Sequence, residues 1–264
     1  MIDLKVRIRR KSFSGKRADV LRALEFDAGA GEFIALVGPS GAGKTTILNL
    51  IGGLDRDFEG DIQINDRPLS DRDTRLIRYG YMFQEPRLMP WLTVEDNVRL
   101  VLNGVDDAIE RARRVIREVE LGGNEKAFPS QLSGGMQRRV ALARAFAVRP
   151  QLMLMDEPFI SLDSPTATRL REQFVALWKE LRPTVLFVTH DLREALAVAD
   201  RVIFLSVSPA RVVKILQVDL PRPRDPDGKA VSDMHACLLH DHPDLLSGLM
   251  AADRGSNSEQ RRTA

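Results

Sequence analysis

Apolar residues follow two rhythms along this chain: short unbroken runs, and longer segments in which they recur every three or four positions. The run at residues 33–37 ends at a glycine and is typical of a strand buried on both faces of a parallel sheet. Similar runs follow at residues 152–155 and 185–188. The segment between these two runs has helical spacing, so the order strand, helix, strand indicates a parallel sheet with right-handed crossovers.

Two helices are predicted to pack on this sheet. One begins after Lys44 and closes at Gly52-Gly53, and its buried side would consist of Ile47, Leu48, Leu50 and Ile51. The other is expected to have Ser164 as its N-cap and Pro165 as its first helical residue. Its buried stripe would consist of Leu170, Phe174, Leu177, Trp178 and Leu181.

Residues 86–148 differ from the rest because they contain helical patterns and no convincing strand. Thr93 and Asp96 form the pattern of a capping box at a helix start. A further apolar stripe precedes Gly122-Gly123 and consists of Ile109, Ala112, Val115, Ile116 and Val119. We therefore interpret the middle of the chain as a helical lobe inserted into an α/β core.

Composition narrows the possible functions. With 264 residues, 44% of them hydrophobic, the chain can form one substantial core. Its net charge of +2 gives no strong attraction to nucleic acid or acidic membrane, and the basic clusters near Arg9 and Arg113 are interpreted as solvated surface. A single cysteine, Cys237, excludes an internal disulfide and indicates a reducing compartment.

The chain contains no apolar run that approaches the ~20 residues needed to span a bilayer. Its first residues alternate as in a strand and lack the apolar centre of a secretion signal. We therefore expect a cytosolic protein that works at a membrane only when a partner holds it there.

The strongest chemical signal is the glycine-rich segment between the first apolar run and the helix that follows it. Glycines let consecutive backbone N–H groups point at phosphate oxygens, and the helix N-terminus adds its positive end. Lys44 would reach the β- and γ-phosphates of ATP, and the Thr45 hydroxyl would ligate Mg²⁺. The predicted ATP-binding residues of this segment are Gly38, Pro39, Ser40, Gly41, Ala42, Gly43, Lys44, Thr45 and Thr46.

Two carboxylates follow the buried run at residues 152–155 directly. Asp156 and Glu157 would therefore lie at the carboxyl end of a strand, where open parallel sheets bind their ligands. Asp156 is expected to hold Mg²⁺, directly or through water. Glu157 would act on the attacking water, as a general base or by orienting it.

A third motif distinguishes this chain from other ATPases. The chain contains the segment Leu132-Ser133-Gly134-Gly135-Met136-Gln137-Arg138-Arg139, in which Ser133 lies 23 residues before Asp156. This segment resembles the signature of ABC-transporter ATP-binding subunits. The resemblance covers about residues 1–220. It implies an α/β fold, with a P-loop NTPase (RecA-like) core around a parallel sheet, an N-terminal antiparallel β subdomain and an inserted helical subdomain that carries the signature. The implied ABC ATPase domain at 1–220 divides into a core at about 1–85 and 149–220 and a helical subdomain at about 86–148, followed by a C-terminal tail at 221–264.

The resemblance also assigns roles to single residues. Gln84, 40 residues after Lys44, matches the Q-loop and would sense Mg²⁺ and the γ-phosphate. Asp163 matches the D-loop and would link two ATP sites across a dimer. His190 matches the switch histidine, which contacts the γ-phosphate and aligns the water. The catalytic residues expected on this basis are Glu157, His190 and Gln84.

The signature has a physical interpretation of its own. Ser133 is a good N-cap residue, and Gly134 and Gly135 expose backbone N–H groups at a helix start, which makes a second anion site without a carboxylate. In the family, the signature of one subunit covers the γ-phosphate bound by the other. The expected assembly is therefore a head-to-tail dimer of two copies that share their ATP sites.

The adenine-binding residue departs from the usual family pattern. Family members commonly stack adenine on an aromatic side chain, often tyrosine, that precedes the phosphate loop. Phe13, 31 residues before Lys44, is the best candidate here and offers a ring without a hydroxyl. The alternative is that Phe13 belongs to the core.

The segment after Gln84 resembles the bacterial importer ATPases for nitrate, sulfonate and taurine, through Leu88-Met89-Pro90-Trp91 and Asp156-Glu157-Pro158-Phe159. The resemblance implies ATP and Mg²⁺ as cofactors and membrane permease subunits as partners, with an extracytoplasmic solute-binding protein as an indirect partner. It places the chain at the cytoplasmic face of the bacterial inner membrane, and nucleic acid is not an expected partner. Trp91 would anchor the permease, or alternatively close the core of the helical lobe.

Two other functions stay open. The chain could serve an exporter or a lipoprotein-release system, or it could be a soluble ABC ATPase that acts on DNA or ribosomes. Soluble members usually carry coiled-coil insertions, paired ATPase domains or strong basic patches, and none of these is evident in the sequence.

The tail begins with a turn-rich segment at residues 221–226. On a helix, His235 and His242 would share one face, whereas Cys237 and His240 would lie on nearly the opposite face, so a metal site is not expected. The end of the chain, from Ala252, is polar and is expected to be disordered.

Overall fold

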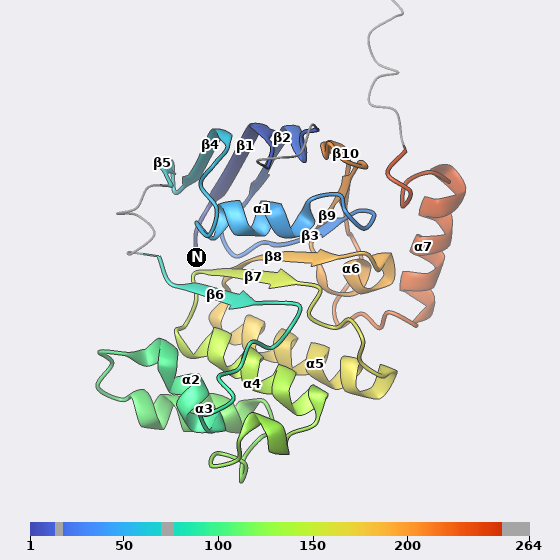
Figure 1. The fold of residues 1–264 in the computed structure, drawn as a ribbon. Coiled ribbons are helices and arrows are strands. Elements are labelled where there is room, and N and C mark those ends of the chain that lie inside the picture. The colour runs from blue at the N-terminus through green and yellow to red at the C-terminus, as the bar shows by residue number, and fades with distance from the viewer. Residues whose placement is uncertain (14–17, 70–76, 250–264) are drawn as a thin grey trace, which may run out of the picture.

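The computed structural model describes residues 1–13, 18–69 and 77–249, and their strands form two sheets (Figure 1). The larger sheet has the strand order β10-β9-β3-β8-β7-β6. Its members are β3 (Phe33–Val37), β6 (Tyr79–Met82), β7 (Leu152–Asp156), β8 (Thr184–Thr189), β9 (Arg201–Leu205) and β10 (Val212–Gln217). Neighbouring strands from β6 to β9 are parallel, and β10 pairs with β9 in the antiparallel sense. The predicted parallel sheet is confirmed.

The central strands of this sheet are buried on both faces, which explains their continuous apolar runs. Every residue of β3, β7 and β8 is buried. The two faces of β3 contribute to separate cores: Phe33 and Ala35 pack in one, and Ile34 and Leu36 pack in the other. The first core is shared with the helical part of the chain, and the second with α1 (Lys44–Ile51) and the smaller sheet.

The smaller sheet is antiparallel and has the order β2-β1-β4-β5. Its strands are β1 (Leu4–Lys11), β2 (Leu21–Ala28), β4 (Glu59–Ile64) and β5 (Arg67–Pro68). Residues of β1 and β2 largely alternate between buried and exposed, as expected when only one face of a sheet meets the core. Helix α1 lies between the two sheets in Figure 1, and the expected N-terminal antiparallel subdomain is confirmed.

Residues 86–148, all of them described, contain helices and no strand, as predicted. Thr93 caps α2, because its Oγ1 accepts a hydrogen bond from the Asp96 N–H at 3.1 Å. One expectation is wrong: Ile109 is 44% exposed, because in the first turn of α3 the side chain that packs against the core is that of Ala108. The helices are α2 (Val94–Arg99), η2 (Leu100–Leu102), α3 (Ala108–Glu118), η3 (Pro129–Gln131) and α4 (Gly134–Ala147).

The helix between β7 and β8 begins one residue away from the predicted position. In α5 (Ser164–Leu181) the N-cap is Asp163, whose Oδ2 accepts a hydrogen bond from the Thr166 N–H at 3.2 Å. Ser164 is therefore the first helical residue and not the cap. Aspartate and serine are both good caps, so their order in the sequence could not decide between them.

The tail packs on the α/β core. Helix α7 (Lys229–Asp241) lies against α6 (Leu192–Val198), and its residues Val231 and Leu238 are buried in the core. The division of the chain at residue 220 stays a proposal. The end from Ala252 lies outside the described residues.

In the described part of the chain, no helix is long and apolar enough to cross a membrane. No group of three or more His, Cys, Asp or Glu side chains in that part is placed to hold a metal ion.

Candidate functional site

The glycine-rich loop connects β3 to α1 at the carboxyl end of the parallel sheet. Gly41 and Gly43 have φ values of +78° and +81°, which disfavour any residue with a side chain. A Cβ atom on Gly43 would lie 2.8 Å from the Leu21 side chain and 2.9 Å from that of Val20. At Gly43 the loop therefore has no room for a side chain, whereas at Gly41 only the backbone conformation calls for glycine.

The Lys44 side chain folds back onto the first residues of the loop. Its side chain is 6% exposed, and its Nζ donates hydrogen bonds to the carbonyl oxygens of Gly38 at 2.8 Å and Pro39 at 3.0 Å. Burial lowers the pKa of Lys44, and the charges of Glu157 and Asp156 oppose that shift. The arrangement holds a desolvated ammonium against the loop, where an anion can replace its carbonyl partners.

Asp156 is the last residue of β7 and lies close to Thr45. Its carboxyl group is buried, which raises its pKa, whereas a hydrogen bond from the Thr45 hydroxyl opposes the shift. A carboxylate beside a hydroxyl is a pair of oxygen ligands of the kind that Mg²⁺ prefers. These two residues therefore fit the predicted Mg²⁺ site, whose third predicted member is Gln84.

Glu157 leaves the sheet in a sharp turn. It has a φ of +44°, and its N–H donates to the Val188 carbonyl of the neighbouring strand at 2.9 Å. This turn aims the side chain at the loop: Oε1 lies 3.7 Å from Lys44 Nζ and 3.4 Å from His190 Nδ1. The His190 side chain is half exposed, so a water molecule can reach the space beside both groups.

A hollow of about 720 Å³ lies in front of the loop. Gln84 lines it together with the loop, Asp156 and Glu157. Phe13 lines it as well and is 38% exposed, so the alternative that Phe13 is a core residue is wrong. The sequence reasoning missed four further lining residues, because no motif marks them: Ala18, Asp19, Val20 and Ser208.

The signature lies elsewhere on the molecule. Ser133 is the N-cap of α4, and its Oγ accepts a hydrogen bond from the Met136 N–H at 3.3 Å. Ser133, Gly134, Gly135 and Asp163 do not line the hollow in front of the loop. The structure thus brings the loop, Gln84 and the two carboxylates together and leaves the signature as a separate surface.

Gly135 is required by packing as well as by any contact with phosphate. A Cβ atom at this position would lie 2.6 Å from Cγ2 of Thr166, in the first turn of α5. Gly135→Ala should therefore lower the free energy of unfolding by about 1–2 kcal/mol, even though alanine favours helices. Urea denaturation measures the loss.

The matched control for this contact is Thr166→Ser, which removes Cγ2 and keeps the hydroxyl. In the Gly135→Ala background it should restore most of the lost stability. A double variant as unstable as Gly135→Ala alone would mean that the contact with Thr166 is not the reason for the glycine.

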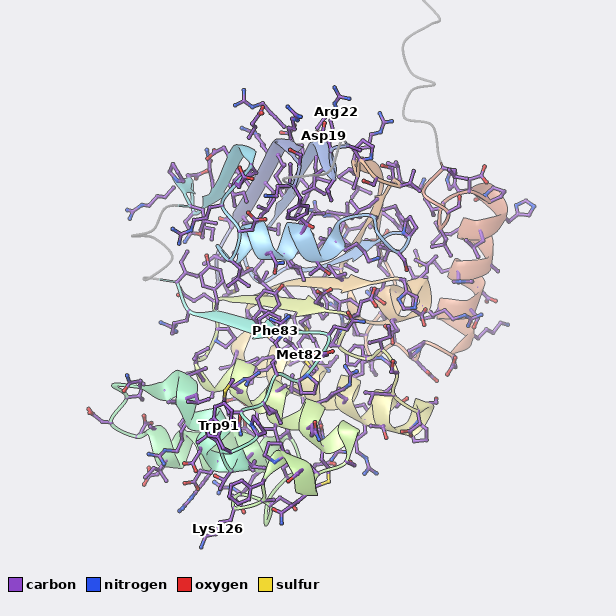
Figure 2. The ribbon with its side chains drawn as sticks, viewed as in Figure 1. Asp19, Arg22, Met82, Phe83, Trp91 and Lys126 are labelled. Carbon is purple, nitrogen blue, oxygen red and sulfur yellow. The ribbon has the colours of Figure 1, made fainter. Side chains whose placement is uncertain are left out.

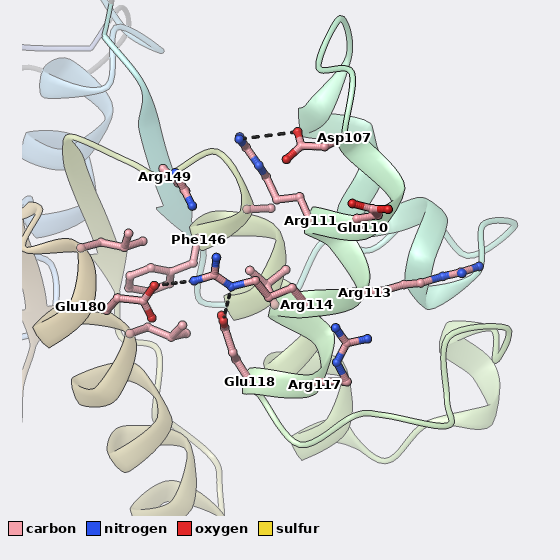
Figure 3. A pocket seen from close by; sticks show the side chains of 14 residues that line it. Asp107, Glu110, Arg111, Arg113, Arg114, Arg117, Glu118, Phe146, Arg149 and Glu180 are labelled. Atoms are coloured by element: carbon pink, nitrogen blue, oxygen red, sulfur yellow. Dashed lines mark hydrogen bonds and ion pairs between the residues drawn. The ribbon is translucent and has the colours of Figure 1, made fainter.

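A second hollow lies between α3, α4 and α5, away from the phosphate loop (Figure 3). Arg111 and Arg114 face acidic partners there: Arg111 Nη2 lies 3.7 Å from Asp107, and Arg114 Nε lies 2.8 Å from Glu118. Arg114 also contacts Glu180 of α5. The contact between Arg114 and Glu180 ties the helical lobe to α5, whereas the other two pairs lie along α3 itself.

Comparison with known proteins decides the family. The ABC transporter family model matches residues 21–160, which include the loop, the signature and the acidic strand end. The chain belongs to the ABC transporter family. It is an ATP-binding, ATP-hydrolysing protein with the fold of an ABC cassette, as the sequence predicted.

Relatives of this ABC ATPase support the narrower resemblance to importers. This chain is 38% identical over 232 residues to the aliphatic sulfonates import ATP-binding protein SsuB of Bacillus subtilis (strain 168). The alignment covers 86% of this chain and 90% of the relative. The chain is 42% identical over 221 residues to an uncharacterized ABC transporter ATP-binding protein of Methanocaldococcus jannaschii, with 81% and 80% covered.

A solved structure matches the fold of this ABC ATPase. The ATP-binding cassette MJ0796, a dimer in a post-hydrolysis state bound to ADP and Pi, has a TM-score of 0.71 and 32% identity. The match covers 84% of this chain and 100% of that one.

Proposed function

We propose that this ABC ATPase hydrolyses Mg-ATP as a head-to-tail pair of copies and thereby energises the import of a small anion such as a sulfonate, taurine or nitrate. The observation that carries the proposal is the separation of two anion-binding features on one chain. Lys44 and its loop form one feature, and the helix start at Ser133 forms the other, outside the hollow that the loop lines.

Within one copy, the loop N–H groups and Lys44 would hold the phosphates of ATP, and Phe13 would stack on the adenine. Thr45 and Asp156 would hold Mg²⁺, which supplies charge neutralisation of the phosphates when bound. Gln84, which also lines the hollow, would complete that ligand set. The positive φ values of Gly41 and Gly43 support this role, because they let the N–H groups of the loop turn toward one bound anion.

Glu157 is the residue best placed to act on the attacking water. Its carboxylate is close to both Lys44 and His190, and only 16% of its side chain is exposed. It would accept the proton of the water or fix its orientation, while His190 contacts the γ-phosphate from the other side.

The second copy would complete each site. Ser133, Gly134 and Gly135 present backbone N–H groups at a helix start whose first turn contains no acidic residue, so they suit the γ-phosphate of an ATP held by the partner copy. Asp163 caps α5 beside this surface and would connect the two sites. The dimeric state of the similar cassette MJ0796 supports this arrangement.

Trp91 supports a partner at the membrane. It is 69% exposed on the segment between β6 and α2 (Figure 2), so the alternative that it closes the core of the helical lobe is wrong. A large exposed aromatic side chain is typical of an interface anchor. We infer that permease subunits dock here and hold the protein at the cytoplasmic face of the bacterial inner membrane, with a solute-binding protein on the other side.

Trp91→Ala should weaken binding to the permease by roughly tenfold or more, as expected for an aromatic anchor worth about 2 kcal/mol. Basal ATPase activity should change less than about twofold, because Trp91 does not line the hollow in front of the loop. Co-purification from detergent-solubilised membranes measures the first effect, and phosphate release measures the second. Ile215→Ala, at an exposed apolar position of β10, is the matched control. Lost ATPase activity with intact docking would contradict the assignment.

The proposed function is tested by affinity purification of the Glu157→Gln protein from host membranes in the presence of ATP, followed by mass spectrometry. A polytopic permease in the eluate supports transport, and a solute-binding protein encoded with it identifies the class of substrate. An eluate that contains only soluble or ribosomal partners overturns the importer proposal. An export or lipoprotein-release complex in the eluate would overturn the direction of transport.

A further inference from the structure

Two arginine side chains of the signature helix α4 donate hydrogen bonds to backbone carbonyl groups of other motifs. Arg138 Nη1 donates to the carbonyl oxygen of Gln84 at 3.0 Å and to that of Pro158 at 2.9 Å. The guanidinium of Arg144 donates to the carbonyl oxygens of Pro86 and Arg87, both at 2.8 Å. Both side chains thus bind the short segment that begins at Gln84.

Neither guanidinium makes a recorded ion pair with a carboxylate of the described residues. Burial lowers the pKa of both Arg138 and Arg144, and no neighbouring acid opposes the shift. A partly buried cation without a counter-ion is costly, so its hydrogen bonds to carbonyl groups must provide the compensation. Arginine suits this task because it is long and has several donors in one plane.

Arg138 connects three motifs through one atom. Gln84 follows β6, and Pro158 follows Glu157 at the end of the neighbouring strand β7. The side chain itself comes from the second turn of α4, whose N-cap is Ser133. The positions of Gln84, Glu157 and the signature helix are therefore linked by two hydrogen bonds of a single guanidinium.

Within the described residues the exposed Gln84 side chain makes no hydrogen bond or ion pair, so what fixes Gln84 is the contact of Arg138 with its backbone carbonyl. The tyrosine and phenylalanine before it, Tyr81 and Phe83, stack on each other with ring centroids 4.0 Å apart, and Arg87 lies over the Phe83 ring. The segment around Gln84 is thus held at both ends, and Arg138 holds its first carbonyl. A shift of the Gln84 backbone would pull on Arg138 and hence on α4.

We propose that Arg138 is a positioning residue for hydrolysis. It holds the Gln84 backbone at a fixed distance from the backbone next to Glu157, and it transmits a displacement of Gln84 to the signature helix. This inference rests on the proposed function, because it needs Gln84 and Glu157 to act on the same nucleotide. Arg138 itself does not line the hollow in front of the loop and is not expected to touch ATP.

Arg138→Gln should lower kcat for Mg-ATP hydrolysis by about 10- to 100-fold, the cost of a small misplacement of reacting groups, with KM changed less than about threefold. Arg138→Lys should recover part of kcat, because an ammonium still has donors for both carbonyl groups. The control is Arg169→Gln, whose side chain is 61% exposed and 3.9 Å from Glu120, and which should retain full activity. A purely structural role would instead lower the melting temperature and leave Arg138→Lys no better than Arg138→Gln.

A double-mutant cycle with Gln84→Ala tests whether Arg138 acts through Gln84. Once the Gln84 side chain is absent, the loss of Arg138 should reduce kcat by less than about twofold further. Losses that multiply, or an unchanged kcat in Arg138→Gln, would overturn the inference. If Arg138→Gln does not fold, Arg138→Lys in the same cycle gives the answer. Normal hydrolysis by Glu157→Gln would instead refute the proposed site itself, so the two failures are distinguishable.

Discussion

Replacing Glu157 with glutamine should lower kcat for ATP hydrolysis by about 10²- to 10³-fold while Mg-ATP still binds. The amide has nearly the same shape as the carboxylate, but it cannot take a proton from water, and it loses the charge attraction to Lys44 at 3.7 Å. Trapped ATP should make the protein accumulate as a dimer. Phosphate release measures hydrolysis, and light scattering after size-exclusion chromatography measures the mass.

Glu110→Gln is the matched control, because Glu110 is an exposed carboxylate on α3 outside the hollow that the loop lines. It should hydrolyse ATP at the normal rate and stay monomeric under the same conditions. A Glu157→Gln protein that hydrolyses ATP as fast as this control would remove Glu157 from the mechanism.

Ser133→Arg should abolish hydrolysis, by about 100-fold or more, and leave nucleotide binding within about threefold of the normal affinity. Ser133 is exposed at the start of α4 and does not line the hollow of its own chain, so a bulky side chain there cannot block that hollow directly. It would block the surface that faces the γ-phosphate of a partner copy. Equilibrium binding of a fluorescent ATP analogue and steady-state hydrolysis separate the two effects.

Ser133→Ala controls for the lost cap, because the Ser133 side chain accepts a hydrogen bond from Met136 and its removal should cost about 1 kcal/mol of stability. A mixture of Ser133→Arg and Lys44→Ala gives a sharper result. Each mixed dimer would contain one site with an intact loop and an intact signature, so the mixture should hydrolyse ATP faster than the sum of its parts. No gain on mixing, or equal loss of binding and hydrolysis, would argue against a shared site.

The parts of the fold that the sequence predicted are those with local causes. The run at residues 33–37 is continuous because both of its faces are buried, and the helix after Lys44 has one buried side. The glycine positions of the loop motif, between strand and helix, also indicated where the backbone has positive φ values. Two predictions failed, the N-cap at Ser164 and the burial of Ile109. Both residues lie in the first turn of a helix, where a shift of one residue changes the cap or the buried side chain.

Contacts between distant segments could not be predicted. Arg138 and Gln84 are 54 residues apart, and no spacing rule pairs an arginine with a backbone carbonyl. Val20, just before β2, packs so close to Gly43 that a side chain there would clash with it, and Phe13, just after β1, lines the hollow. Such contacts depend on how the two sheets and the helical lobe are assembled, which local patterns do not specify.

The two-sided packing of β3 has a consequence for the energetics of nucleotide capture. Phe33 and Ala35 pack in one core, and Ile34 and Leu36 pack in the other. The strand that precedes the loop is therefore held in place from both faces. An incoming triphosphate therefore meets a largely preorganised receptor, and little conformational entropy is lost on that side. The ordering cost of binding should fall on the exposed Gln84 side chain, which makes that residue the natural place to register whether the nucleotide is present.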